Sequence, residues 1–262
     1  MIDFASLRED SAEAVSSLLE GLDPRIGREA FLQEVEALCL HFHILAVSTL
    51  LLDGDAQHFF LNLCRAAENW RRMLMHARAQ GWPHPPATRN MPLLGAAAAG
   101  QWTLASEVAA LSTCPWREGE EYEDDHCWAL VLQELVQARQ ENPARIEALL
   151  VRMEALGGDA AESRLGMARG LLTGNQHAFL DAFTRALQER GEWLESRAHS
   201  FTTPVTKFAP HRYLWLEGLA LLRLGERAGF KELGGYHRYC PPLARLPMRV
   251  AYTGDWAFSL GG

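Results

Sequence analysis

Apolar residues recur along this chain every three to four positions, as on one face of a helix, and the alternation typical of strands is hard to find. Asp23-Pro24 is a typical helix start, and the apolar stripe that follows predicts a helix to about Leu52. Asp53-Gly54-Asp55 ends this helix, Asp55 caps the next, and Gly81-Trp82-Pro83 ends that one. The short loop between the two helices predicts an antiparallel hairpin, assigned to residues 1–82.

A proline-rich link from Pro83 to Pro92 is the best internal boundary, and the helices predicted after it are shorter and paired. Residues 93–262 form this helix-pair region, which we expect to pack as one unit with the hairpin. The predicted pairs and their breaks are Leu93–Ala99 before Gly100-Gln101, a helix from Asn142-Pro143 to Gly157-Gly158, Ser163–Leu172 before Gly174-Asn175, and Pro210–Leu224 before Gly225-Glu226.

Three of these breaks share a pattern of small and apolar residues, a glycine turn and a polar helix start, which is typical of tetratricopeptide-like helix pairs. Their uneven spacing excludes a regular array. The sequence therefore predicts an all-α fold: an irregular helical bundle or α-solenoid of antiparallel helix pairs, with a concave surface. Leu214–Leu224 is apolar almost all round and should be buried. Residues 234–262, rich in proline and glycine, should pack as irregular structure over the last helices.

The composition narrows the possible partners and the compartment. The formal charge of −8 argues against nucleic-acid binding and suits a basic partner. Five cysteines without a CxxC pair indicate free thiols in a reducing compartment. The N-terminus lacks the pattern of a signal peptide, and the most apolar segment, Ile44–Leu52, is too short to span a bilayer. We expect a cytoplasmic protein without a membrane association. The oligomeric state stays open.

The most unusual stretch is acidic and ends at His126. Its carboxylates are Glu118, Glu120, Glu121, Glu123, Asp124 and Asp125. In one interpretation they begin a helix: acidic side chains oppose the positive end of the helix dipole, and Asp124 or Asp125 is the N-cap. In the other, Glu121, Asp124 and Asp125 lie on the same face as the apolar stripe that follows and line a groove, as partner contacts or metal ligands.

Trp116 directly precedes this stretch, and an exposed tryptophan beside acidic residues is a plausible hot spot for a protein partner. The candidate partner-binding residues are therefore Trp116, Glu118, Glu120, Glu121, Glu123, Asp124 and Asp125.

Signs of catalysis are weak. The chain contains no P-loop, no GxGxxG, no HExxH and no GxSxG. Cys39 and His43 are four residues apart but without further ligands nearby, so we interpret them as core residues. Glu217 in the most apolar helix is expected to pair with an arginine, for which Arg212 and Arg223 are candidates. We therefore expect no enzyme, with no catalytic residues, no metal and no cofactor.

Four segments together resemble the all-helical immunity protein family numbered 49 of bacterial polymorphic toxin systems. They are Gly100–Ala105, Glu121–Asp125, Leu216–Leu222 and Cys240–Arg245, and the resemblance covers roughly Leu93 to Arg245. It implies a cytoplasmic antidote that binds a cognate toxin, often a nuclease, and blocks its active site or its access to substrate. The acidic residues would then occupy the basic groove with which a nuclease binds phosphates.

Two other functions remain open. A tetratricopeptide-like scaffold or regulatory module would bind several partners weakly, whereas an antidote binds one partner tightly. An enzyme would require a bound metal or cofactor.

Overall fold

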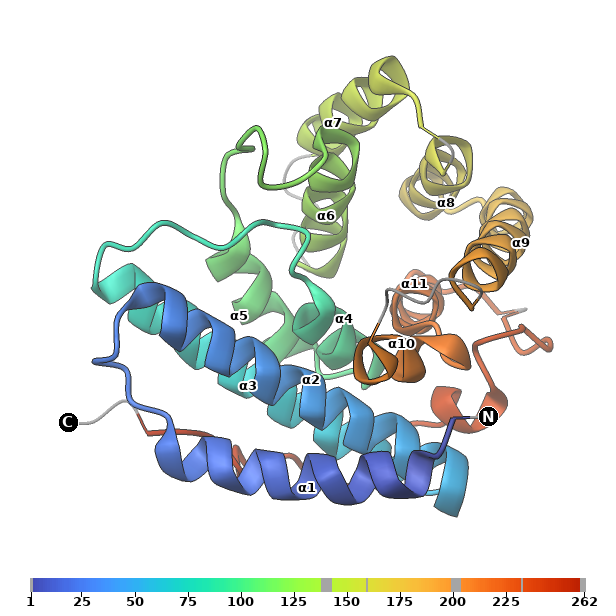
Figure 1. Cartoon of the computed structure of the whole chain (residues 1–262). Helices are drawn as coiled ribbons and strands as arrows, with labels where there is room; N and C mark the ends of the chain where they lie inside the picture. The colour runs from blue at the N-terminus through green and yellow to red at the C-terminus, as the bar shows by residue number, and fades with distance from the viewer. Residues whose placement is uncertain (1, 138–142, 159, 199–203, 232, 260–262) are drawn as a thin grey trace.

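The computed structural model describes residues 2–137, 143–158, 160–198, 204–231 and 233–259, and every regular element within these ranges is helical (Figure 1). The all-α prediction is confirmed. The elements are α1 (Phe4–Gly21), α2 (Arg28–Asp53), α3 (Ala56–Ala79), α4 (Met91–Ala98), α5 (Trp102–Ser112), α6 (Glu123–Val136), α7 (Pro143–Leu156), α8 (Ala161–Thr173), α9 (Gln176–Ala198), α10 (Val205–Arg212), α11 (Leu216–Arg227) and the 3₁₀ helix η1 (Pro242–Arg245).

The predicted hairpin is formed by α2 and α3, which pack against each other. Gly54 has a φ of 67°, a left-handed conformation that glycine adopts without steric cost, and it ends α2. The Asp55 carboxylate caps α3 by accepting hydrogen bonds from the backbone amides of Gln57, at 2.9 Å, and His58, at 3.0 Å. The short loop and its cap therefore act as predicted.

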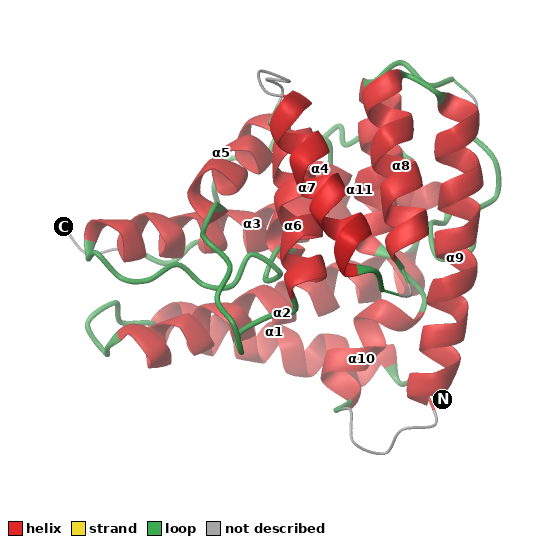
Figure 2. Ribbon diagram, turned by 90° about the horizontal axis from the view of Figure 1, so that it is seen from above, coloured by secondary structure: helices red, strands yellow, loops and turns green. Residues whose placement is uncertain are grey.

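The start of the hairpin differs from the prediction. The Asp23 carboxylate accepts hydrogen bonds from the backbone amide and the guanidinium of Arg25, which produces a turn instead of a helix start. Consequently α2 begins only at Arg28. The chain before this turn forms α1, a helix that the sequence did not predict, and α1 packs along α2 (Figure 2).

The helix α2 is long and apolar enough to cross a membrane, the only such helix within the described residues. Its apolar length therefore exceeds the Ile44–Leu52 segment singled out from the sequence. In the structure, α2 packs against α1, α3 and α10, and Phe31, Val35 and Phe42 are buried in the protein core. The hydrophobic residues of α2 thus form the centre of the helical core.

After the link, α4 packs on both α3 and α11, which joins the two halves of the chain. The last residue of the predicted link, Pro92, already belongs to α4. Successive helices from α6 to α9 are neighbours and follow an arc (Figure 1). The helices α8 and α9 approach each other closely, since a Cβ on Gly170 would meet the backbone nitrogen of Phe179 at 2.8 Å. The predicted cap Asn142 lies outside the described residues.

The segment Pro210–Leu224 was predicted to be one helix. In the structure it comprises the end of α10 and most of α11. Trp215, directly before α11, has an extended backbone, and its amide donates to the carbonyl of Tyr239, at 2.8 Å. Gly225-Glu226 continues α11 rather than turning, and the missing side chain of Gly225 leaves space for Leu233 and Phe230 to pack against the helix. The apolar residues between Leu214 and Leu224 are buried, as predicted.

The C-terminal segment was predicted to pack over the last helices. Part of it also lies along α3. The Asn69 amide donates to the carbonyl of Trp256, at 2.9 Å, and Arg65 pairs with Asp255, at 2.7 Å. Phe258 is buried and packs edge-on against Phe31, with ring centroids 5.6 Å apart. These contacts connect residues 187 to 227 positions apart, which helical periodicity cannot reveal.

Candidate functional site

The acidic stretch forms the loop between α5 and α6 and the first turn of α6, and it surrounds an open hollow of about 600 Å³. The hollow is bordered on one side by the link between α3 and α4, through Thr88. Its other lining residues are Trp116, Glu118, Gly119, Glu120, Glu121, Tyr122, Glu123 and Asp125. Of the seven predicted partner-binding residues, only Asp124 is not among them.

Glu121 forms the buried floor of this hollow. Its carboxylate accepts hydrogen bonds from the backbone amides of Thr88, at 2.9 Å, and Ala87, at 3.3 Å, and from Nδ1 of His126, at 2.8 Å. Only 4% of its side chain is exposed. Burial raises the pKa of Glu121, but the hydrogen bonds from Thr88, His126 and Ala87 outweigh it, and the pKa lies below its ordinary value. Glu121 therefore fastens the link to α6 and presents little of itself to a partner.

Three further acidic residues pair with arginines of the next two helices. Arg152 of α7 contacts Glu123 at 2.7 Å, and Arg164 of α8 contacts Asp125 at 2.8 Å and Asp124 at 4.0 Å. One interpretation predicted that Asp124 or Asp125 is the N-cap of α6. This prediction is wrong, because the helix begins at Glu123 and Tyr122 is the cap residue. All three lie in the first turn, where negative charge is stabilised by the helix dipole.

The exposed part of the loop includes the side chains of Trp116, Glu118, Glu120 and Tyr122. Trp116 is 38% exposed and its indole donates to the Glu121 carbonyl, at 3.1 Å, so that the ring is held in place. Glu120 pairs with Arg117 at 2.7 Å, whereas Glu118 has no ion-pair partner among the described residues. Tyr122 is 80% exposed.

Tyr122 was missed as a candidate. Its position between Glu121 and Glu123 indicates exposure, because a helix start rich in charged residues usually faces solvent.

The loop keeps a net negative charge despite its ion pairs. Six carboxylates, of Glu118, Glu120, Glu121, Glu123, Asp124 and Asp125, face three guanidinium groups, of Arg117, Arg152 and Arg164. Counting these groups alone, three negative charges are not compensated. The arrangement thus combines an excess of negative charge with two exposed aromatic rings, a combination that fits recognition of a basic protein surface.

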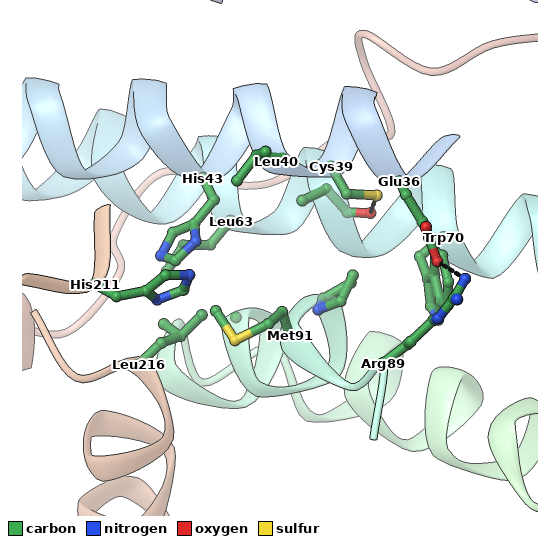
Figure 3. Close-up of a pocket in the computed structure, with 13 residues that line it drawn as sticks. Glu36, Cys39, Leu40, His43, Leu63, Trp70, Arg89, Met91, His211 and Leu216 are labelled. Atoms are coloured by element: carbon green, nitrogen blue, oxygen red, sulfur yellow. Dashed lines mark hydrogen bonds and ion pairs between the residues drawn. The ribbon is translucent and has the colours of Figure 1, made fainter. Parts of the chain in front are cut away.

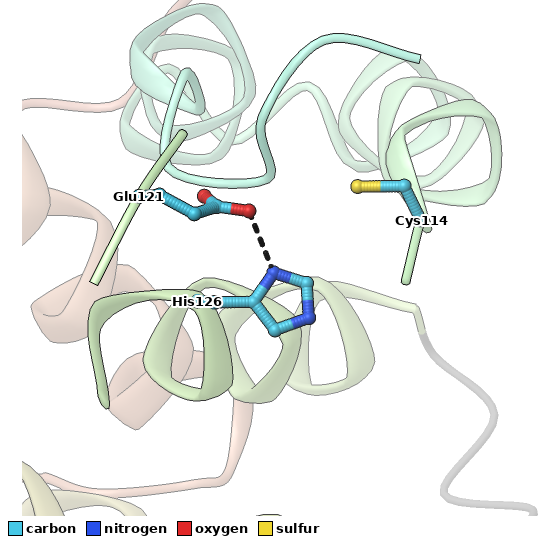
Figure 4. A group of neighbouring side chains, drawn as sticks. All are labelled: Cys114, Glu121 and His126. Atoms are coloured by element: carbon cyan, nitrogen blue, oxygen red, sulfur yellow. Dashed lines mark hydrogen bonds and ion pairs between the residues drawn. The ribbon is translucent and has the colours of Figure 1, made fainter. Parts of the chain in front are cut away.

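Cys114, Glu121 and His126 come together below the hollow (Figure 4), with one possible ligand atom of each within 4.8 Å of the others. Both oxygens of Glu121 and Nδ1 of His126 already take part in the hydrogen bonds described above. The Cys114 thiol donates to the carbonyl of Pro85, at 3.6 Å, and burial raises its pKa. Through these hydrogen bonds the three side chains connect the link between α3 and α4 to the start of α6.

The other residues considered for chemistry lie elsewhere. Cys39 and His43 are buried on α2, and the Cys39 thiol donates to the carbonyl of Ala66, at 3.3 Å. Glu217 was predicted to pair with an arginine, Arg212 or Arg223. Instead, its carboxylate accepts a hydrogen bond from the indole of Trp128, at 3.0 Å. The helix α11 thereby contacts α6 through a partly buried polar bond.

The chain matches no family model, no curated protein and no solved structure. The resemblance to the immunity protein family is therefore supported only by the four sequence segments that suggested it.

Proposed function

We propose that this protein is a cytoplasmic antidote that binds a cognate bacterial toxin, a nuclease with a basic active-site groove, and blocks its active site or its access to substrate. The proposal combines the sequence resemblance with one observation, the acidic hollow bordered by the exposed rings of Trp116 and Tyr122. An acidic loop held by its own ion pairs enters a basic groove without first being ordered, which lowers the cost of binding.

The residues of the hollow have different parts in this proposal. Glu121 positions the loop, and Glu123, Asp124 and Asp125 hold it against α7 and α8 through arginines. Glu118 and Tyr122 are the residues most open to a partner. We expect Tyr122 and Trp116 to provide most of the binding energy, and the carboxylates to accelerate association.

The first experiment is capture of a partner with the tagged protein from a lysate of its native cells, with identification by mass spectrometry. The proposal expects one stoichiometric partner with a basic catalytic domain that survives a stringent wash. Affinity for that purified domain is then measured for Glu118→Lys and Tyr122→Ala. The matched control is Glu13→Lys, which makes the same charge change at an exposed position of α1.

We expect each loop variant to weaken binding by about tenfold or more, and Glu13→Lys to have little effect. The association rate should fall as the salt concentration rises, because unpaired charges at a surface are screened. Several weak partners in place of one would refute the antidote proposal and favour the scaffold alternative. If a partner binds tightly and neither loop variant changes its affinity, the interface lies elsewhere on the protein.

A further inference from the structure

A second cavity, of about 300 Å³, lies between α2, α3 and α4, close to the end of α10 (Figure 3). Its walls are mainly apolar and come from Leu40 of α2, Leu63, Ala66 and Trp70 of α3, Met91 of α4 and Leu216 of α11. A volume of this size is typical of a site for a small organic molecule, because an apolar cavity of about half this volume is known to hold benzene.

The two ends of the cavity differ in polarity (Figure 3). The imidazole rings of His43 and His211 meet at one end, with centroids 4.9 Å apart. Glu36 and Arg89 form an ion pair at the other end. Glu36 and His43 are seven residues apart on α2, so the cavity extends over about 10 Å of helix.

His43 provides an unused hydrogen-bonding group. The residue is only 5% exposed, and its Nε2 atom has no hydrogen-bond partner within the part of the chain that the structure describes. Buried polar atoms are almost always paired with protein or with water, so an unpaired one beside a cavity indicates that something else completes it.

The two imidazoles at this end are neutral at pH 7. Burial, together with repulsion from Arg190 and from His211 in its protonated form, lowers the pKa of His43 well below its ordinary value. Burial and Arg190 also lower the pKa of His211, to about 4. Two neutral imidazoles can donate or accept a hydrogen bond but offer no charge to an ionic ligand.

We propose that this cavity binds a small, neutral, mainly apolar molecule with one hydroxyl or carbonyl group, which forms a hydrogen bond with His43. A carboxylate or an amine would lose its hydration without gaining a counter-charge from the cavity walls, because Glu36 and Arg89 already neutralise each other and Arg190, although close to the histidines, does not line the cavity. The site is separate from the acidic hollow, and the inference does not depend on the proposed partner.

The test uses 2-naphthol, with naphthalene as the probe without a hydroxyl group and 2-naphthoate as the anionic probe. Binding is followed by NMR of protein labelled with ¹³C at the methionine methyl groups. Met91 lines the cavity, and Met75, exposed on α3, serves as the internal reference. The Met91 signal is assigned with Met91→Leu. We expect 2-naphthol to shift the Met91 signal with a submillimolar Kd and to bind more tightly than either other probe.

Two variants separate the hydrogen bond from the apolar cavity. His43→Leu should weaken 2-naphthol binding about fivefold, the equivalent of one neutral hydrogen bond, and leave naphthalene binding unchanged. Ala66→Leu narrows the cavity and should weaken both probes. The matched control is His41→Leu on the same helix, because His41 contacts Ser11 and does not line the cavity.

Three results would overturn the proposal. The first is no selective Met91 shift with 2-naphthol at millimolar concentration. The second is equal 2-naphthol affinity in wild type and His43→Leu, which would remove His43 from the site. The third is tighter binding of 2-naphthoate than of 2-naphthol, which would show that the cavity selects an anion.

Discussion

The buried carboxylate of Glu121 should stabilise the junction between the link and α6 to a measurable degree. It accepts hydrogen bonds from the amides of Ala87 and Thr88 and from His126. A hydrogen bond to a charged group contributes about 1.5–3 kcal/mol. Gln retains one acceptor oxygen, so Glu121→Gln should lower the free energy of unfolding by about 2 kcal/mol. Glu121→Ala leaves all three donors without this partner and should cost about 4 kcal/mol.

The pH dependence follows from the lowered pKa of Glu121. The unfolded chain binds a proton to this carboxyl at a higher pH than the folded protein does. The stabilisation is therefore complete above the ordinary glutamate pKa and is lost as the pH falls through the lower pKa of the folded state. Glu121→Gln removes this contribution, so wild type and variant should converge in stability as the solution becomes acidic.

The assay is urea denaturation followed by circular dichroism, together with hydrogen exchange of the Thr88 amide. The control is Glu118→Gln, which makes the same chemical change on an exposed residue of the same loop and should alter stability by less than about 0.5 kcal/mol. If Glu121→Gln is as stable as wild type and its Thr88 amide exchanges no faster, the carboxylate does not hold the link, and the reasoning fails.

Three further predictions concern packing and protonation. Gly170→Ala should destabilise the folded protein by about 1–3 kcal/mol, because its Cβ would lie within 3.0 Å of Phe179. The control is Gly191→Ala on α9, whose Cβ would meet no atom closer than 3.6 Å and which should be neutral or stabilising. Thermal denaturation compares the two. Phe258→Ala should cost about 3–5 kcal/mol in urea denaturation, against less than about 1 kcal/mol for the exposed Val250→Ala, if the C-terminal segment belongs to the core. The pKa of His211, lowered to about 4, shows that the folded protein favours the neutral imidazole. The free energy of unfolding should therefore be up to about 3 kcal/mol higher above pH 6.5 than in acid, and this difference is lost as the pH falls towards 4. His211→Leu should flatten the dependence of stability on pH in that window, and His177→Leu, at an exposed position, should not.

The sequence predicted the helices that a local pattern determines. The Gly54 turn, the Asp55 cap and the Gly100 break act within a few residues of themselves, so one stretch of sequence is enough to locate them. It failed where a contact further along the chain overrides the local pattern. Pro210–Leu224 looks like one helix, yet it is interrupted where the backbone amide of Trp215 donates to the carbonyl of Tyr239, 24 residues later.

The acidic site was predictable in position but not in the part that each residue plays. Charge density and a nearby tryptophan located the loop from sequence. Only the structure separates the buried Glu121 from the exposed Glu118, three residues away. Arg152 and Arg164, which offset two of the three negative charges in the first turn of α6, come from other helices and leave no signal near the acidic stretch.

The link between α3 and α4 explains why neither site could be assembled from the sequence. Ala87 and Thr88 donate to Glu121 below the acidic hollow, and the next residue, Arg89, pairs with Glu36 at the end of the apolar cavity. Three consecutive residues of irregular backbone thus complete two sites that are otherwise built from different helices. Helical periodicity determines which faces of α2, α3 and α6 are buried, but it carries no information about the path of an extended segment between them. That path is determined by a carboxylate 33 residues away along the chain and an ion pair across 53.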